Sequence, residues 1–292
     1  QITVANEFIR ELADEKLAAR NIAGPTAATL HHYRAEARFL RAYQYWVLMD
    51  LFGNPPFVTD KDPIGKFIPV QISRSGLFSY IESELKAIDA DLVPARQNEY
   101  GRADQAAAWA LLARLYLNAQ VYTGTARYTE AITYASKVIN AGFTLMPHYK
   151  QLFMADNNVN NPEVILPIAY DATNSQNYGG TTFLICSAHG TNVADNAKYG
   201  IPGGGWLGNR STAKLPQAFG DYSGNADKRA LFGLGTPDIN DILNFNEGLG
   251  VAKFSNVNAD GSTPYSPNGV LVNTDFPLFR LAEMYRIYIE SV

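Results

Sequence analysis

The sequence predicts a mostly α-helical protein, in which a helical scaffold carries a large irregular, loop-rich region with a few short strands. Three observations predict this fold class. Up to about residue 150, the chain is rich in Ala, Leu, Arg and Tyr, and its apolar residues recur at steps of three and four. From about 155 to 275, short apolar runs are interrupted by Gly, Asn, Asp and Pro. Helical periodicity returns near Pro277 and continues to Val292.

These changes in composition divide the chain into three parts. We expect residues 1–154 to form the scaffold, residues 155–275 to form a ligand-binding region, and residues 276–292 to return to the scaffold as a helix. Loops held by a rigid scaffold commonly carry function, so we expect the site in the middle part.

The first long helix is expected over residues 26–52, with the hydroxyl of Thr26 as its N-cap. Gly53 suits the position after the helix, and the following pair of prolines prevents it from continuing. Arg34, Arg38 and Arg41 fall on one face of this helix. A phosphate site is conceivable there, but we favour a structural role, with acids such as Glu36 or acids on neighbouring helices as partners.

Three more helices are expected over residues 77–91, 104–119 and 128–140, the second of them capped by Asp104 and the third ended by Gly142. Small alanines in 104–119 would let a neighbouring helix approach closely. The helices at 104–119 and 128–140 have the spacing of a tetratricopeptide-like pair. Such a pair needs neighbours to bury its faces, and a final helix beginning at Pro277 would be one of them.

The middle part contains two candidate strands, residues 162–171 and residues 181–188. Both are apolar runs bounded by turn residues. Long connections such as NADGSTPYSPNG (258–269) are unusual in a compact domain and are often functional.

Composition excludes several classes of protein. The 292 residues are 47% hydrophobic, which is enough for a core, and their formal net charge of -4 argues against a nucleic-acid partner. Cys186 is the single cysteine, so no internal disulfide framework exists. No run approaches the roughly 20 apolar residues that a membrane span needs. Gln1 and the helical pattern at Val292 indicate an internal fragment that lacks both termini, so this sequence cannot reveal its own targeting.

Several blocks resemble the SusD/RagB family of outer-membrane nutrient-binding lipoproteins, and they follow in the order that the family has. They are AEARFLRAYQYWVLMDLFGNPPFVTD, GRADQAAAWALLARLYLNA, INAGFTLMPHYKQLF, NNPEVILPIAYD, the Gly-Trp segment with Asn-Arg, DKRALF and TDFPLFRLAEMYRIYIES. The resemblance covers nearly the whole chain. The family's lipidated N-terminal cysteine and its closing region have no counterpart here.

The resemblance implies a function. Such proteins lie on the extracellular face of the outer membrane in Bacteroidota, attached by a lipid anchor. They cap a SusC-like TonB-dependent transporter and capture oligosaccharides, or peptides in some members. They are not enzymes, and no cofactor is expected. The fold that the resemblance implies, tetratricopeptide helices supporting an irregular binding region, agrees with the division read from composition.

The segment GIPGGGWLGNR (200–210) carries the candidate site. Trp206 can stack on the apolar face of a sugar ring, and Asn209 and Arg210 can hydrogen-bond to hydroxyls. Tyr178 and Tyr199 lie in polar, Gly-rich loops and could complete an aromatic cradle, with Tyr265 as a weaker candidate. In the alternative interpretation, Trp206 fills the junction between loops and helices, and Arg210 pairs with an acid.

Catalytic and metal sites have little support. Acids are frequent in the loop-rich region, but none is patterned as the acid and base of a glycosidase. Cys186 and His189 lie close together in CSAH, which is weak evidence for a nucleophile and base because such groups pair in space and not in sequence. His31, His32 and His148 lack metal-ligand spacing. Oligosaccharide capture is the leading hypothesis. The alternatives are a peptide-binding protein, a protein-interaction module and, with less support, a glycan-processing enzyme.

Overall fold

The computed structural model describes residues 1–292, apart from the side chain of Leu234. The chain divides into two compact units. Unit 1 contains Gln1–Phe143 and Phe279–Val292, and unit 2 contains Thr144–Leu278. These limits differ from the expected divisions at 154/155 and 275/276, and the assignment of ligand binding to residues 155–275 stays a prediction.

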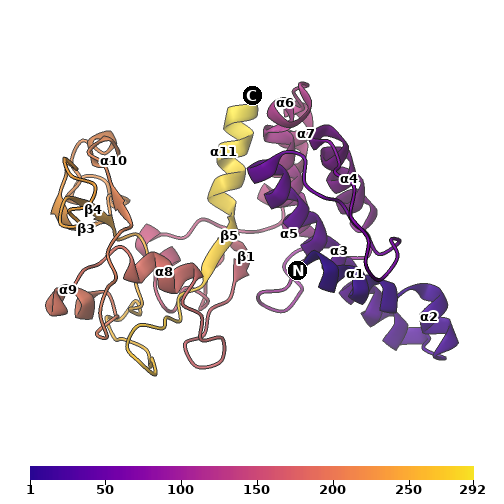
Figure 1. Cartoon of the computed structure of the whole chain (residues 1–292), viewed down its shortest axis with the longest axis horizontal. Helices are drawn as coiled ribbons and strands as arrows, with labels where there is room; N and C mark the ends of the chain where they lie inside the picture. The colour runs from indigo at the N-terminus through magenta and orange to yellow at the C-terminus, as the bar shows by residue number, and fades with distance from the viewer. The chain divides into compact units, whose positions relative to one another are not determined.

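Unit 1 is built from helices (Figure 1). In chain order they are α1 Ile2–Glu11, α2 Asp14–Ala19, α3 Gly24–Phe52, α4 Arg74–Ala87, α5 Gln105–Leu117, α6 Ala119–Thr123, α7 Tyr128–Ile139 and α11 Leu281–Ser291. Helix α3 packs against α1, α4 and α5, while α5, α7 and α11 pack against one another. The mostly helical fold class is therefore confirmed.

Helix α5 is the most deeply buried helix of this unit. Its alanines have no room for larger side chains, since Ala106, Ala107, Ala108, Ala110 and Ala113 are at most 1% exposed. This confirms the expectation that small residues let neighbouring helices approach closely. Arg114 on α5 also forms an ion pair with Glu283 on α11, with 2.6 Å between Nε and Oε1. The C-terminal helix is thus fixed to α5 by both packing and charge.

The N-cap predicted for the first long helix is wrong. Helix α3 begins at Gly24, its N-cap residue is Ala23, and no side chain caps it. Pro25 lies at the start of the helix, where its fixed φ favours helix and its missing N–H needs no partner. Helix α4 also begins earlier than expected, because the hydroxyl of Ser73 accepts a hydrogen bond from the N–H of Gly76.

Asp104 caps α5 as predicted. Its Oδ1 accepts the N–H of Ala107 at 3.0 Å, and its Oδ2 accepts the N–H of Arg96 at 2.6 Å. Asp104→Ala should lower the free energy of unfolding by about 1 to 2 kcal/mol, because both N–H groups lose their acceptor. Denaturant unfolding measures this, with Ser73→Ala as the comparison, because the exposed hydroxyl of Ser73 accepts only one backbone N–H. An Asp104→Ala effect no larger than that of Ser73→Ala would contradict the double role.

A buried charge network joins three helices of unit 1. Arg41 is 3% exposed and donates to Asn6 on α1, to Asp60 and to Glu84 on α4. Arg38 donates two further hydrogen bonds to Glu84. These contacts confirm the structural role expected for Arg38 and Arg41, with acids outside their own helix as partners.

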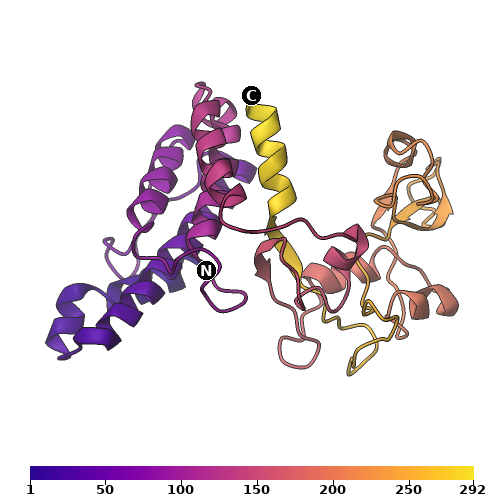
Figure 2. The same ribbon diagram turned by 180° about the vertical axis from the view of Figure 1, so that it is seen from behind.

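Unit 2 is loop-rich and contains short elements (Figure 2). They are the 3-10 helix η1 Tyr149–Phe153, β1 Val164–Ile168, α8 Gly180–Cys186, α9 Val193–Lys198, β2 Arg210–Ser211, α10 Lys214–Ala218, β3 Phe232–Thr236 and β4 Gly248–Val251. Strand β4 lies between β2 and β3 in an antiparallel sheet. Strand β5, Phe276–Arg280, pairs with β1, and the boundary between the units falls inside it.

Two predicted elements are wrong. The strand expected over residues 181–188 is absent, and residues 181–186 belong to helix α8 instead. Thr181, Thr182, Ile185 and Cys186 are the buried residues of this helix, and a short apolar run cannot by itself distinguish a strand from one buried helical face. The final helix begins at Leu281 and not at Pro277, because residues 276–280 alternate in burial as strand β5.

The expected strand at 162–171 is confirmed in a shorter form as β1.

Unit 2 has a core of its own. Its buried members come from η1, α8 and the loops after them, namely Leu152, Phe153, Ile185, Cys186, Ile201, Phe254 and Val272. This core anchors α8, and through α8 it anchors the turn at Ser187–Gly190 beside which the Gly-rich segment lies.

None of the helices in the described part of the chain combines the length and apolar character needed to cross a bilayer.

Candidate functional site

The Gly-rich segment around Trp206 is firmly held by its backbone. Its N–H groups donate to carbonyls at the end of α8 and in the turn that follows: Gly205 to Gly190, Trp206 to Cys186, Leu207 to His189 and Asn209 to Ser187. The distances lie between 2.7 and 3.2 Å. The composition of the segment suggests a flexible loop, but its hydrogen bonds fix the position from which the indole projects.

The glycines allow this close approach. A Cβ at Gly205 would lie 2.2 Å from the carbonyl oxygen of His189, and a Cβ at Gly203 would lie 2.4 Å from that of Asn268. Both distances are far below van der Waals contact, so no other residue fits without movement of the backbone. The segment is therefore clamped between the turn after α8 and the loop at Asn268.

Trp206 and Tyr178 form an exposed pair of rings. Trp206 is 41% exposed and Tyr178 is 59% exposed, and their ring centroids are 6.1 Å apart with an interplanar angle of 41°. The amide of Asn268 donates to the hydroxyl oxygen of Tyr178 at 3.0 Å, which leaves the phenolic hydrogen free to bond elsewhere. The interpretation that Trp206 fills an internal junction does not agree with this exposure.

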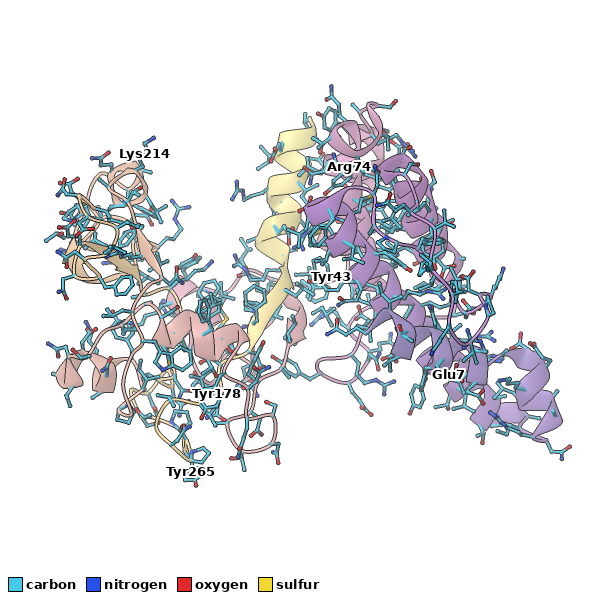
Figure 3. The ribbon with its side chains drawn as sticks, viewed as in Figure 1. Glu7, Tyr43, Arg74, Tyr178, Lys214 and Tyr265 are labelled. Carbon is cyan, nitrogen blue, oxygen red and sulfur yellow. The ribbon has the colours of Figure 1, made fainter. Side chains whose placement is uncertain are left out.

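Tyr265 lies on a neighbouring loop of the same unit. Its side chain is 73% exposed, and its carbonyl accepts a hydrogen bond from the amide of Asn273. Figure 3 shows Tyr178 and Tyr265 on loops below α8 in that view.

Tyr199 packs against His189 and is not part of the pair formed by Trp206 and Tyr178. Its ring packs against the imidazole of His189, with 3.9 Å between the centroids and an interplanar angle of 31°. Burial raises the pKa of the Tyr199 hydroxyl above its ordinary value. The Tyr199 side chain thus stabilises the turn after α8, to which the Trp206 segment is hydrogen-bonded.

Arg210 stabilises a loop of the protein itself. Its guanidinium donates to the carbonyl oxygens of Ile242, Asn244 and Glu247 and lies over the ring of Phe245, with 5.0 Å between Cζ and the centroid. Arg210 therefore does not pair with an acid, and these guanidinium donors are not free for a ligand. Three backbone carbonyls hold the positive charge in place.

Asn209 and Arg210 line a pocket of about 250 Å³. The walls come from the turn after α8, the start of α9, the segment after Trp206 and the loop and strand around Phe245 and Gly250. Trp206 is not among the residues that line it. The structure therefore divides the five predicted residues into the ring pair, the two pocket residues and the supporting Tyr199.

His189 also lines this pocket, and the sequence did not suggest its role. It is 2% exposed, and its Nδ1 lies 2.9 Å from Oδ2 of Asp195 on α9. Its Nε2 is buried without a hydrogen-bond partner among the described atoms. The motif CSAH places the histidine near Cys186 in sequence, but its side chain contacts Asp195 and Tyr199.

The Cys186 thiol is not a nucleophile. It is fully buried, and burial raises its pKa to about 12. A thiol with this pKa stays protonated near neutral pH. Among the described residues there is also no group of three or more His, Cys, Asp and Glu side chains placed to hold a metal ion.

The buried His189 makes stability depend on pH. Burial lowers its pKa below the ordinary value of 6.5 and outweighs the opposite effect of Asp195. Below about pH 6.5, the unfolded chain binds a proton that the folded chain does not bind. Stability is therefore full above this pH and falls as the pH decreases, by at most about 1.4 kcal/mol per pH unit.

Calorimetric melts between about pH 7.5 and 5.5 test this prediction. We expect His189→Asn to flatten the decrease seen for the wild type, while the exposed-site variant His148→Asn keeps it. Equal pH dependence in wild type and His189→Asn would show that another group is responsible.

Comparison with known proteins shows to which family the chain belongs. Residues 1–117 match a family model described as "Starch-binding associating with outer membrane". Over 92% of this chain, the sequence is 37% identical to the starch-binding protein SusD of Bacteroides thetaiotaomicron. The chain belongs to the SusD-like family. It spans 56% of the length of that curated relative.

Solved structures show the same SusD-like fold. A laminarin-binding SusD-like protein matches with a TM-score of 0.74 and 20% identity, over 99% of this chain and 64% of that one. Surface glycan-binding protein A of Bacteroides fluxus matches with a TM-score of 0.69 and 20% identity, over 99% and 60%. The resemblance read from the sequence blocks is thus confirmed, together with the mostly helical fold class.

Proposed function

We propose that this SusD-like chain captures neutral oligosaccharides without cleaving them, for delivery to a SusC-like TonB-dependent transporter of the outer membrane. The single observation that carries the binding step is the exposed pair of Trp206 and Tyr178. Two neighbouring exposed rings offer an apolar surface to the C–H faces of successive sugar units. The phenolic hydrogen of Tyr178 adds a donor for a hydroxyl at its edge.

A preformed platform supports capture at low entropic cost. Backbone hydrogen bonds hold the Trp206 segment, and Asn268 holds Tyr178 while its own Oδ1 accepts the N–H groups of Val270 and Leu271. Rigid aromatic groups lose little conformational freedom on binding. The relatives named as starch-binding and laminarin-binding support a glucan as the first ligand to test.

A non-catalytic role is supported by the acids near the site. Glycosidases use two carboxyl groups on either side of the scissile bond. The described residues that line the pocket include one carboxylate, that of Asp195, and its Oδ2 lies 2.9 Å from Nδ1 of His189. Attachment to the extracellular face of the outer membrane by a lipid anchor belongs to the same proposal.

Calorimetric titration with maltoheptaose, laminariheptaose and a mixed peptide digest tests the proposal. We expect heat of binding for at least one of the two glucans, no binding of the peptides, and no new reducing ends after prolonged incubation. Binding of the peptides alone would favour the peptide-binding alternative. Release of reducing ends would favour an enzyme.

A further inference from the structure

The pocket behind the Trp206 segment has a role that the aromatic platform does not explain. Trp206 does not line it, whereas the next residues of the segment, Leu207 to Arg210, do. One short segment therefore presents the indole and then forms a pocket wall. All residues of both features belong to unit 2.

The pocket is large enough for one sugar ring but too small for a whole oligosaccharide. Its volume of about 250 Å³ lies just below the range of about 300–1,000 Å³ that drug-sized ligands occupy. An oligosaccharide must therefore lie outside, and only an end or branch unit can enter.

The chemistry of the walls suits a neutral polyhydroxylated ring. The side-chain amides of Asn209 and Asn246 make no hydrogen bond to other described residues, so their donors and acceptors are free for a ligand. Phe245 is 51% exposed and offers an apolar surface to C–H groups. Free amides next to an aromatic ring match the alternating polar edge and apolar face of a pyranose.

The positive charge of the pocket is already held by the protein itself. Three backbone carbonyls surround the guanidinium of Arg210, and the carboxylate of Asp195 lies in the same pocket against His189. The guanidinium is therefore not free to balance the charge of an acidic ligand. This argues for a neutral sugar over a uronic acid or a sialic acid.

Two buried atoms on the lining residues point to a missing partner. The hydroxyl of Ser187 and Nε2 of His189 have no hydrogen-bond partner among the described atoms. Burying such a group unpaired lowers the stability of the folded state, and native structures rarely retain one without a reason. Both residues line the pocket, so a hydroxyl of a bound sugar is the partner that these atoms lack.

We propose that this pocket is a second carbohydrate subsite, which holds a single neutral pyranose unit between Asn209, Asn246 and Phe245. The inference rests on the proposed function, since it treats the unit as the end or branch of a captured glycan. It adds a site that recognises one ring independently of the platform.

Saturation-transfer NMR with free monosaccharides tests the subsite. The probes are D-glucose, D-galactose, D-mannose and N-acetyl-D-glucosamine, each at millimolar concentration. We expect saturation transfer to at least one of them with the wild type and also with Trp206→Ala. The double variant Asn209→Ala/Asn246→Ala should weaken this binding about 10-fold, because two hydrogen bonds are lost.

The matched control is Asn225→Ala/Asn240→Ala. These two asparagines are exposed on the same unit, their side chains make no hydrogen bond to other described residues, and neither lines the pocket. The control should leave the signal unchanged.

Each failure has a distinct signature. No transfer to any of the four sugars, or equal transfer with wild type and the pocket double variant, overturns the subsite. Loss of transfer in Trp206→Ala alone assigns the sugar to the platform and also overturns it. If glucan oligosaccharides fail to bind the wild type in calorimetry, the proposed function fails separately.

Discussion

Replacing Trp206 with alanine is expected to reduce the affinity for a captured oligosaccharide by about 30-fold or more. Exposed aromatic anchors at binding sites commonly contribute 2 kcal/mol or more, and about 1.4 kcal/mol corresponds to a factor of ten. The substitution removes one of the two rings of the platform. It leaves the backbone hydrogen bond from Trp206 to Cys186 in place, so the segment keeps its position.

Tyr222→Ala is the matched control for this prediction. Tyr222 lies in the same unit and is also 41% exposed, but its ring contacts Phe232 outside the platform. Calorimetry should show unchanged affinity for this variant, and Trp206→Phe should keep part of the wild-type affinity. Equal losses in Trp206→Ala and Tyr222→Ala would mean that the effect is not local, and no loss in Trp206→Ala would remove the platform.

Replacing Arg41 with methionine is expected to lower the free energy of unfolding of unit 1 by about 3 to 5 kcal/mol. Removing one partner of a buried ion pair leaves the other charge uncompensated. Here the loss affects Asp60 and Asn6, and Glu84 keeps only Arg38. Methionine fills a similar volume, so the effect measures the charge network and not a cavity.

The exposed Arg20→Met variant is the comparison for Arg41. Arg20 pairs with Glu11, and both side chains are more than a third exposed. Solvent screens such pairs, so its unfolding midpoint should remain at the wild-type value. The account of unit 1 requires Arg41→Met to be clearly less stable than Arg20→Met in denaturant unfolding, and equal midpoints would contradict it.

The helical scaffold could be predicted because long periodic segments carry their own signal. The helix at Tyr128–Ile139 and the cap at Asp104 follow from local sequence alone. The short segments failed where tertiary pairing decides. Residues 276–280 become a strand because β1 is available as a partner, and no local pattern records that pairing.

The candidate site was only partly accessible from the sequence. A tryptophan among glycines and a tyrosine in a polar loop are local signals, and the structure brings Trp206 and Tyr178 together. Arg210 reads locally as a free donor, yet its carbonyl partners lie in a distant segment, at 242–247. The pocket formed by Asn209 and Phe245 is likewise created by strand pairing, since β2 and β4 bring these segments together.

The most direct test of the binding account is a crystal structure of the protein soaked with the glucan oligosaccharide that binds best in calorimetry. We expect a pyranose ring with its carbon atoms within about 4.5 Å of the indole of Trp206, and a neighbouring unit against the ring of Tyr178. A glycan bound elsewhere on the chain, with both rings free of contact, would contradict the account.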